Sequence, residues 1–363
     1  MRLPGGATAR EGHTTGADTT MSTHRIAFAA VAAAASLVMS ACAGGGASDT
    51  AGAAAAAAPA DATTVNLYAY AVPKVGYDKL IPAFQATEAG KDVQFQQSYG
   101  ASGDQSRKVE AGAEADFVNF SVEPDITRLV DAGLVDPAWN SNEHQGIPFG
   151  SVVTIVVREG NPKGIADWDD LLEPGVEVVT PNPFSSGSAK WNLLAPYAAK
   201  SNGGVDEQAG LDYISKLVGE HVEIQPKSGR EATEAFLQGS GDVLLSYENE
   251  ALFIEGKGDP VEHVTPPQTF KIENPAAVLT KSPNAVKAKA FNDFLYTPEA
   301  QRLWAEAGFR PVDTTVAAEF ADDFPQPEKL WTIADLGGWK QVDSTLFKKD
   351  VGSIAKIYDE ATQ

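Results

Sequence analysis

The sequence predicts an α/β fold of two lobes, in which mixed, mainly parallel sheets carry helices on both faces. After residue 62, short β-rich segments alternate with segments of helical spacing, which is typical of βαβ units. A long β-rich run at residues 151–158 interrupts this pattern, and the alternation restarts after it. We interpret this run as a strand that carries the chain from one lobe to the other. Two lobes joined in this way can hold a ligand in the cleft between them.

The individual elements follow from two periodicities. Strands alternate or are rich in β-branched and aromatic residues, whereas helices space apolar residues by three or four. In the first lobe we expect strands at 65–70, 93–97 and 116–120, and helices at 77–86, 105–113 and 125–132. In the second lobe we expect strands at 176–180, 222–225 and 242–246, and helices at 189–199 and 230–237. After a loop at Pro266 and Pro267, we expect a strand at 276–279 and helices at 285–296 and 298–307.

These elements predict the organisation of the whole chain. Residues 1–41 form a leader, and residues 42–62, mostly Ala, Gly, Ser and Pro, form a flexible tether. The remaining parts are a first lobe at 63–150 and 248–310, a second lobe at 151–247, and a C-terminal segment at 311–363 that packs on the lobes.

The leader has the pattern of a secretory signal. From Met21, which we take as the true start, a short cationic stretch precedes an apolar stretch at residues 26–40, and small residues then precede Cys42. This resembles a bacterial lipoprotein signal, with Met39 where leucine is usual. The resemblance implies that Cys42 is acylated and anchors the protein to the membrane, outside the cytoplasm. A buried Ala-rich helix is the alternative, and the glycines that follow Cys42 disfavour it.

The composition excludes several classes of partner and cofactor. Asp and Glu total 49 against 28 for Lys and Arg, so the net charge is -21, and nucleic acid is excluded as a partner. The single cysteine excludes an intrachain disulfide, and few histidines remain outside the leader, so we expect no metal site and no cofactor. An anion would also be repelled at long range. Any anion site must therefore gain its affinity from groups close to the ligand. Salt screens the repulsion from surface charges that are more than about 8–10 Å away.

One local pattern recurs and favours an anion site. At residues 98–103, 182–188 and 228–229, a predicted strand ends in a Ser/Gly turn and a predicted helix begins. The start of a helix offers unpaired backbone N–H groups and a partial positive charge, and glycine lets an anion come close to them. Ser and Gly before a helix are also ordinary capping residues. Three such turns on one chain, each after a strand, favour the anion site.

The same turns carry a family resemblance. The stretches TPNP at 180–183 and SGSAKWN at 186–192 resemble the signature of the sulfate-binding proteins of ABC importers. Similar stretches follow the family's order along the chain: QSYGASG at 97–103, GDVLLSYENEA at 241–251, RP at 310–311 and GGW at 337–339. The resemblance implies a type II periplasmic binding protein whose lobes close on the ligand. It also implies a monomeric receptor, without enzymatic activity, that delivers sulfate to an ABC importer.

The resemblance further implies a set of site residues. The ligand would receive the Ser102 hydroxyl, the Tyr247 side chain, and the backbone N–H groups of Ala71, Ser186, Gly187, Ser188 and Gly229. Arg230 would brace the site from behind.

The chain departs from the family at several of these positions. Ala71 and Val72 replace an Asp-Pro pair, and Ser188 replaces a glycine, but a backbone donor survives both changes. Tyr247 replaces a tryptophan, and a phenol can accept a hydrogen bond whereas an indole only donates. Asp104 replaces a lysine.

These departures leave alternatives open. Asp104 could accept the proton of monohydrogen phosphate, or it could be a first-turn acid that the helix dipole favours. The ligand could therefore be phosphate, thiosulfate or molybdate instead of sulfate. A secreted hydrolase with Ser102 or Ser186 as nucleophile is a less favoured alternative, because no partner base is evident. A signalling or structural lipoprotein that kept the fold and lost the ligand is another.

Overall fold

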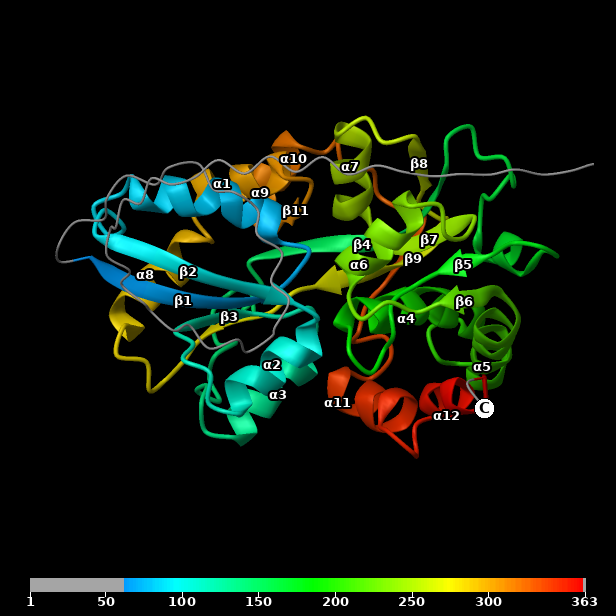
Figure 1. The fold of residues 1–363 in the computed structure, drawn as a ribbon, viewed down its shortest axis with the longest axis horizontal. Helices are drawn as coiled ribbons and strands as arrows, with labels where there is room; N and C mark the ends of the chain where they lie inside the picture. The colour runs from blue at the N-terminus through cyan, green and yellow to red at the C-terminus, as the bar shows by residue number, and fades with distance from the viewer. Residues whose placement is uncertain (1–61, 362–363) are drawn as a thin grey trace, which may run out of the picture. The chain divides into compact units, whose positions relative to one another are not determined.

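Two β-sheets organise residues 62–361, the part of the chain that this computed structural model describes (Figure 1). The predicted leader, Cys42 and the tether up to residue 61 lie outside the described residues. The first sheet has four strands in the order β10-β3-β1-β2. The second has eight strands in the order β12-β9-β4-β7-β5-β6, with β8 and β11 also paired to β4. The predicted mixed α/β fold with two sheets is confirmed.

The first sheet is parallel except for its last strand. Its parallel strands are β1 (Thr63–Tyr70), β2 (Val93–Gly100) and β3 (Phe117–Asn119), and β10 (Ala276–Val278) runs antiparallel to β3. Figure 1 shows α1 above this sheet and α2 and α3 below it. The helices of this lobe are α1 (Lys74–Gln85), α2 (Ser102–Glu110), α3 (Glu123–Asp131), α8 (Ala285–Phe294) and α9 (Pro298–Glu306).

Strand β4 (Phe149–Arg158) is the centre of the second sheet. It pairs antiparallel with β7 (Val243–Tyr247), β8 (Val261–Val264), β9 (Gln268–Glu273) and β11 (Arg310–Pro311). All its residues except Arg158 are buried, as expected of a continuous apolar run that is covered on both faces. On one side, β5 (Val178–Val179) runs parallel to β7, and β6 (Val222–Ile224) runs parallel to β5. On the other side, β12 (Lys329–Trp331) runs parallel to β9.

The helices of the second lobe cover this sheet. They are η1 (Trp168–Leu172), α4 (Gly187–Ser201), α5 (Glu207–Lys216), η2 (Leu217–His221), α6 (Gly229–Leu237) and α7 (Glu248–Gly256). The C-terminal part adds α10 (Thr314–Glu319), α11 (Trp339–Val342), η3 (Asp343–Phe347) and α12 (Ser353–Ala361). Helix α12 packs on α5, whereas α11 contacts α3 of the first lobe, so this segment touches both lobes.

Each predicted strand and helix is present, with ends that differ by a few residues. The sequence did not predict α5, α7, β8, β9 or the C-terminal elements. Helix α7 was hidden because its first turn, Glu248 to Glu250, is polar and follows a strand directly, yet all three residues are buried.

The pairing of β8 and β9 bears on the lobe boundaries. Both strands lie within the range 248–310 that we assigned to the first lobe, but they pair with β4 in the second sheet. Helix α7 also packs on β4 and β8. We therefore propose that the second lobe extends to Glu273 and that the first lobe resumes at Asn274. The other predicted boundaries stay predictions.

Close packing of α1 on α9 depends on a glycine. A Cβ atom on Gly76 would lie 2.1 Å from ring carbon Cζ3 of Trp304, so only glycine fits without movement of the indole. We expect Gly76→Ala to lower the free energy of unfolding by about 1–3 kcal/mol, because overpacking forces the ring to move. Urea unfolding measures this change.

Gly256 provides the matched control. It is the last residue of α7, and a Cβ atom there would meet nothing within 4 Å. Gly256→Ala should be neutral or slightly stabilising, since alanine favours a helix over glycine by about 1 kcal/mol. Equal losses in the two variants would contradict the packing argument.

Candidate ligand-binding site

Three helices begin at the predicted Ser/Gly turns. Helix α2 of the first lobe begins at Ser102, and helices α4 and α6 of the second lobe begin at Gly187 and Gly229. The first N–H groups of a helix have no partner within it and carry a partial positive charge. The Gly103 amide donates to the Ser185 carbonyl oxygen at 3.1 Å, which joins the start of α2 to the turn before α4. The structure thus brings helix starts from both lobes together.

Two glycines allow this close approach. A Cβ atom on Gly187 would lie 2.7 Å from Cβ and Oγ of Ser121 in the first lobe. A Cβ atom on Gly229 would lie 2.8 Å from Oγ of Ser188 and 3.4 Å from Cγ2 of Val72, the neighbour of Ala71. Larger residues at either position would hold the elements apart. The predicted residues from Ala71 to Gly229 therefore converge where the lobes meet.

Ser121, which the sequence did not predict, lies at the centre of this convergence. Its amide donates to Ser102 Oγ at 2.9 Å, and its carbonyl accepts from Trp191 Nε1 at 2.8 Å and from Asn274 Nδ2 at 3.0 Å. Its hydroxyl lies 2.7 Å from the Tyr247 hydroxyl. Ser121 belongs to no motif. The available signal was its place just after strand β3, where ligands bind in α/β sheets.

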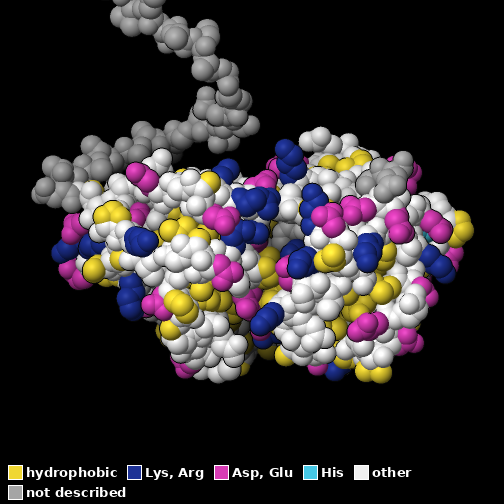
Figure 2. Space-filling view, turned by 90° about the horizontal axis from the view of Figure 1, so that it is seen from below, with side chains coloured by type: hydrophobic (Ala, Val, Ile, Leu, Met, Phe, Trp, Pro, Cys, Tyr) yellow, Lys and Arg dark blue, Asp and Glu magenta, His cyan; other side chains and the backbone are white. Residues whose placement is uncertain are grey.

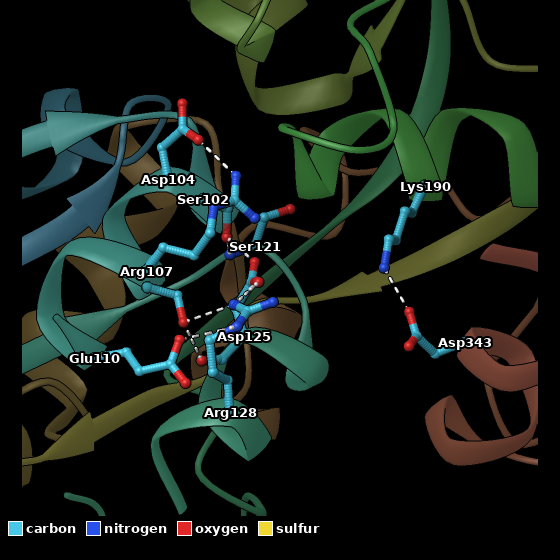
Figure 3. A network of polar contacts seen from close by, with 10 residues as sticks. Ser102, Asp104, Arg107, Glu110, Ser121, Asp125, Arg128, Lys190 and Asp343 are labelled. Atoms are coloured by element: carbon cyan, nitrogen blue, oxygen red, sulfur yellow. Dashed lines mark hydrogen bonds and ion pairs between the residues drawn. The ribbon is translucent and has the colours of Figure 1, made fainter. Parts of the chain in front are cut away.

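The Ser102 hydroxyl differs from its predicted role. It donates to Asp125 Oδ2 at 2.6 Å, and Arg128 Nη1 donates to the other carboxylate oxygen at 2.9 Å. Figure 3 shows this chain of contacts from Arg128 through Asp125 to Ser102 and Ser121. A hydroxyl has one proton, and the nearby carboxylate, a strong acceptor, takes it. The proton of the Ser102 hydroxyl is therefore used in a hydrogen bond within the protein.

Ser186 also differs from its predicted role, because its amide donates to the Asn182 carbonyl oxygen at 2.9 Å within the turn. Its side chain makes no hydrogen bond to cap α4, although the residue is buried. The amide of Ser186 is thus used within the turn, whereas its hydroxyl does not cap α4. Ser188 lies two residues further along the chain, in the first turn of α4.

Tyr247 ends β7 and is 1% exposed. Burial raises the pKa of Tyr247 well above its usual value, and side-chain hydrogen bonding with Ser121 offsets this only in part. The phenol therefore stays protonated at neutral pH. The ring of Tyr70 in the first lobe lies 6.5 Å from the Tyr247 ring, between centroids.

The two predicted supporting residues lie at the edge of the site. Asp104 pairs with Arg107 at 2.5 Å, and both side chains are largely exposed, as a first-turn acid of α2 would be. Arg230 follows Gly229 and extends to α7, where its Nη2 lies 3.1 Å from Glu250 Oε2. Its bracing role stays a prediction.

The surroundings of the site carry cations although the whole chain is acidic. Figure 2 shows Lys and Arg side chains along the groove between the lobes on the face drawn. Within residues 62–361, no cluster of His, Cys, Asp and Glu side chains is suited to hold a metal ion. No helix in that same range has the length and apolar character needed to cross a membrane.

Comparison with known proteins identifies the family. Residues 65–310 match the family described as bacterial extracellular solute-binding protein. The chain belongs to this family. The sulfate-binding protein of Synechococcus elongatus is 41% identical over 292 residues, which cover 78% of this chain and 83% of that protein.

Two further comparisons agree with this assignment. The thiosulfate-binding protein of Pseudomonas aeruginosa is 35% identical over 303 residues, which cover 80% of this chain and 90% of that protein. The solved structure of the sulfate-binding protein SubI from Mycobacterium tuberculosis is 66% identical, with a TM-score of 0.78, and the match covers 79% of this chain and all of that chain. These matches confirm the family and the two-lobed binding-protein fold predicted from the sequence.

Two buried glutamates at the start of α7 differ in their surroundings. Glu248 accepts two hydrogen bonds from Arg310, at 2.6 and 2.8 Å. Glu250 lacks such a bidentate partner, and burial raises its pKa, an effect that Arg230 only partly offsets. Ionised Glu250 therefore lowers the free energy of unfolding. The loss is complete at pH values above the pKa in the folded state, and it is absent below the pKa in the unfolded state, where the side chain is protonated in both states.

We therefore expect opposite effects from the same change at the two positions. Glu250→Gln should stabilise the fold at pH 7, and the gain should shrink as the pH falls toward the usual glutamate pKa. Glu248→Gln should destabilise it by on the order of 3 kcal/mol, since it breaks a buried ion pair. Urea unfolding at pH 7 and at lower pH tests both. A loss of stability in Glu250→Gln at pH 7 would contradict the assignment.

Proposed function

We propose that this protein captures sulfate between its lobes and delivers it to an ABC importer. One observation carries the proposal: the starts of α2, α4 and α6 converge from both lobes, with glycines at the points of closest approach. Helix starts are ready-made sites for tetrahedral anions. The relatives named sulfate-binding proteins, at 41% identity and at 66% identity for the solved structure, support sulfate as the ligand.

The proposed contacts are all hydrogen-bond donors. They are the amides of Ala71, Gly187, Ser188 and Gly229, and the hydroxyls of Ser186 and Tyr247. Sulfate carries no proton at neutral pH, so it can only accept, and donors alone suit it. Ser102 acts through Ser121, to which it is bonded. No salt bridge is required, because each helix start contributes a partial positive charge.

Binding is coupled to closure of the lobes. The lobes already share direct bonds, from the Gly103 amide to Ser185 and from the Trp191 indole to the Ser121 carbonyl. An anion that contacts both lobes stabilises the closed form by the free energy of those extra contacts. Release then needs the lobes to part, and we assign this step to docking on the membrane subunits of the importer.

The proposed location is outside the cytoplasm, at the membrane surface. The family description as extracellular solute-binding proteins supports export. Acylation of Cys42 would hold the binding unit to the membrane through the tether at residues 42–62. Such an anchor keeps the receptor near its importer.

The alternatives receive less support from the site. Monohydrogen phosphate needs an acceptor for its proton, and Asp104 is already paired with Arg107. A serine hydrolase needs a base beside its nucleophile, but the Ser102 hydroxyl donates to a carboxylate that is itself paired with Arg128. His221 and His263 have partners elsewhere, at Val176 and Glu255.

Calorimetric titration of the full chain with sulfate tests the proposal. We expect the unaltered chain to bind one sulfate. The Ser186→Ala variant should bind sulfate about 10–100-fold more weakly, since a hydrogen bond to a charged group contributes about 1.5–3 kcal/mol. Ser201→Ala is the matched control, because Ser201 is a buried serine at the far end of α4 whose hydroxyl accepts from the Gly204 amide. Absence of sulfate binding by the unaltered chain would refute the proposed function.

The membrane anchor has its own test. Cys42→Ser should release the protein from the membrane fraction of cells into the soluble extracytoplasmic fraction, because it removes the acylated thiol. Its sulfate affinity should stay the same, since Cys42 lies outside the binding unit. A variant that still sediments with membranes would show that another segment anchors the chain.

A further inference from the structure

A cavity of about 460 Å³ lies at the strands that join the two lobes. Its floor is formed by β4 and β9, and its walls by the loop before β4, by β11, and by residues between α10 and β12. None of the residues predicted to bind the ligand lines it. The cavity is therefore separate from the proposed anion site.

The strand orders place the cavity and the anion site on opposite sides of the crossing between the lobes. The chain crosses at the start of β4 and again between β9 and β10. The cavity lies at β12, β9 and β4, whereas the turns of the anion site follow β7, β5 and β6 in the second sheet and β3, β1 and β2 in the first. A rotation about the crossing strands that parts the lobes at the anion site therefore brings the cavity walls together.

Each wall of the cavity is fixed to one lobe. The buried side chain of Gln301 on α9 donates to the Pro148 carbonyl at 2.8 Å and accepts from the Val312 amide at 2.7 Å. Helix α10, which carries Ala317, also packs on α9. On the other side, Leu330 lies on β12, which is paired with β9 in the second sheet. The walls therefore move with their lobes.

The structure shows the arrangement in which this cavity is wide. The lobes are joined across the anion site by the bonds from Gly103 to Ser185 and from Trp191 to Ser121. Small side chains leave the space free at the wall that α10 and the residues after it form, since that wall includes Ala317 and Ala321. A larger side chain there fits while the lobes are together, but it meets the opposite wall as they part.

We propose that this cavity is the clearance that the lobes need in order to open, and that the small side chains of Ala317 and Ala321 set the sulfate affinity by keeping it free. Filling the cavity disfavours the open form, so the closed form gains population. The apparent dissociation constant falls as the binding-competent fraction rises. This inference rests on the proposed function and deepens it, since it names a part of the fold that allows the anion to be released.

The test compares Ala317→Leu and Ala317→Phe with the unaltered full chain by calorimetric titration with sodium sulfate. We expect both variants to bind sulfate more tightly, and Phe to have the larger effect because it fills more of the cavity. A closed form that makes up about 10% of the free chain allows a gain of up to about tenfold. Sulfate should also dissociate more slowly in stopped-flow measurements, because release needs the open form.

A second measurement needs no ligand. Small-angle X-ray scattering of the sulfate-free proteins should give a smaller radius of gyration for the two Ala317 variants than for the unaltered chain. Ala321→Leu repeats both measurements from a position outside α10, so an effect on the helix itself is excluded.

Ala318→Leu is the matched control. Ala318 is the next residue of α10, but it is exposed and does not line the cavity. The same enlargement there should leave the sulfate affinity and the radius of gyration unchanged.

Each result bears on one proposal or the other. Weaker sulfate binding in the Ala317 variants, or unchanged affinity in both Ala317→Phe and Ala321→Leu, would overturn the role of the cavity. An equal gain in Ala318→Leu would overturn it as well. If the unaltered chain bound no sulfate, the proposed function itself would fall, whereas the radius of gyration would still test the cavity.

Discussion

Ser121 uses each hydrogen-bonding group it has, and its bonds hold the two lobes together at the site. Its amide is fixed by the first lobe, its carbonyl by the indole of Trp191 and the amide of Asn274, and its hydroxyl by Tyr247. Gly187 must be a glycine because Ser121 lies against it. The side chain and backbone of Ser121 thus help to position α4, β7 and the segment that returns to the first lobe.

The C-terminal segment supports this arrangement from outside. Trp339 of α11 packs edge-on against Trp191, with ring centroids 4.7 Å apart. Lys190 of α4 pairs with Asp343 at 2.6 Å, as Figure 3 shows. These contacts fix the first turn of α4, and with it the indole that bonds Ser121. A segment with no residue in the predicted site therefore helps to form it.

The proposed anion receptor is an acidic chain, and the proposed site meets this electrostatic problem locally. The net charge of -21 opposes the approach of a dianion. Around the site, the cations Arg107, Arg128 and Arg230 are each paired with a carboxylate. In the proposed site, backbone dipoles and hydroxyl protons are left to contact the anion. They carry no full charge whose burial would have to be balanced in the empty form.

The sequence predicted the parts of the site that have local signals. A Ser/Gly turn between a strand and a helix is a short pattern, so Ser102, Gly187 and Gly229 were placed at helix starts correctly. Ser121 and Asn274 were missed because their contacts join residues that are 126 and 153 positions apart, and no short pattern encodes such pairs. The commitment of the Ser102 hydroxyl to Asp125 was missed for the same reason.

Element types were predictable where apolar periodicity was strong, and they failed where it was masked. Helix α7 begins with buried polar residues whose partners, Arg310 and Arg230, lie on other elements. The lobe boundaries could not be predicted for a similar reason. Only the pairing of β8 and β9 with β4 assigns these strands to the second sheet.

The central place of β4 also has a consequence for the order of folding. Its partners β7, β8, β9 and β11 all lie far towards the C-terminus, up to Pro311. The sheet around it cannot form until most of the chain has been synthesised. Pairing over such long separations is slow, because the ends of long loops must meet first. A chain built in this way stays unfolded for longer during synthesis than one whose strands pair with close neighbours in sequence.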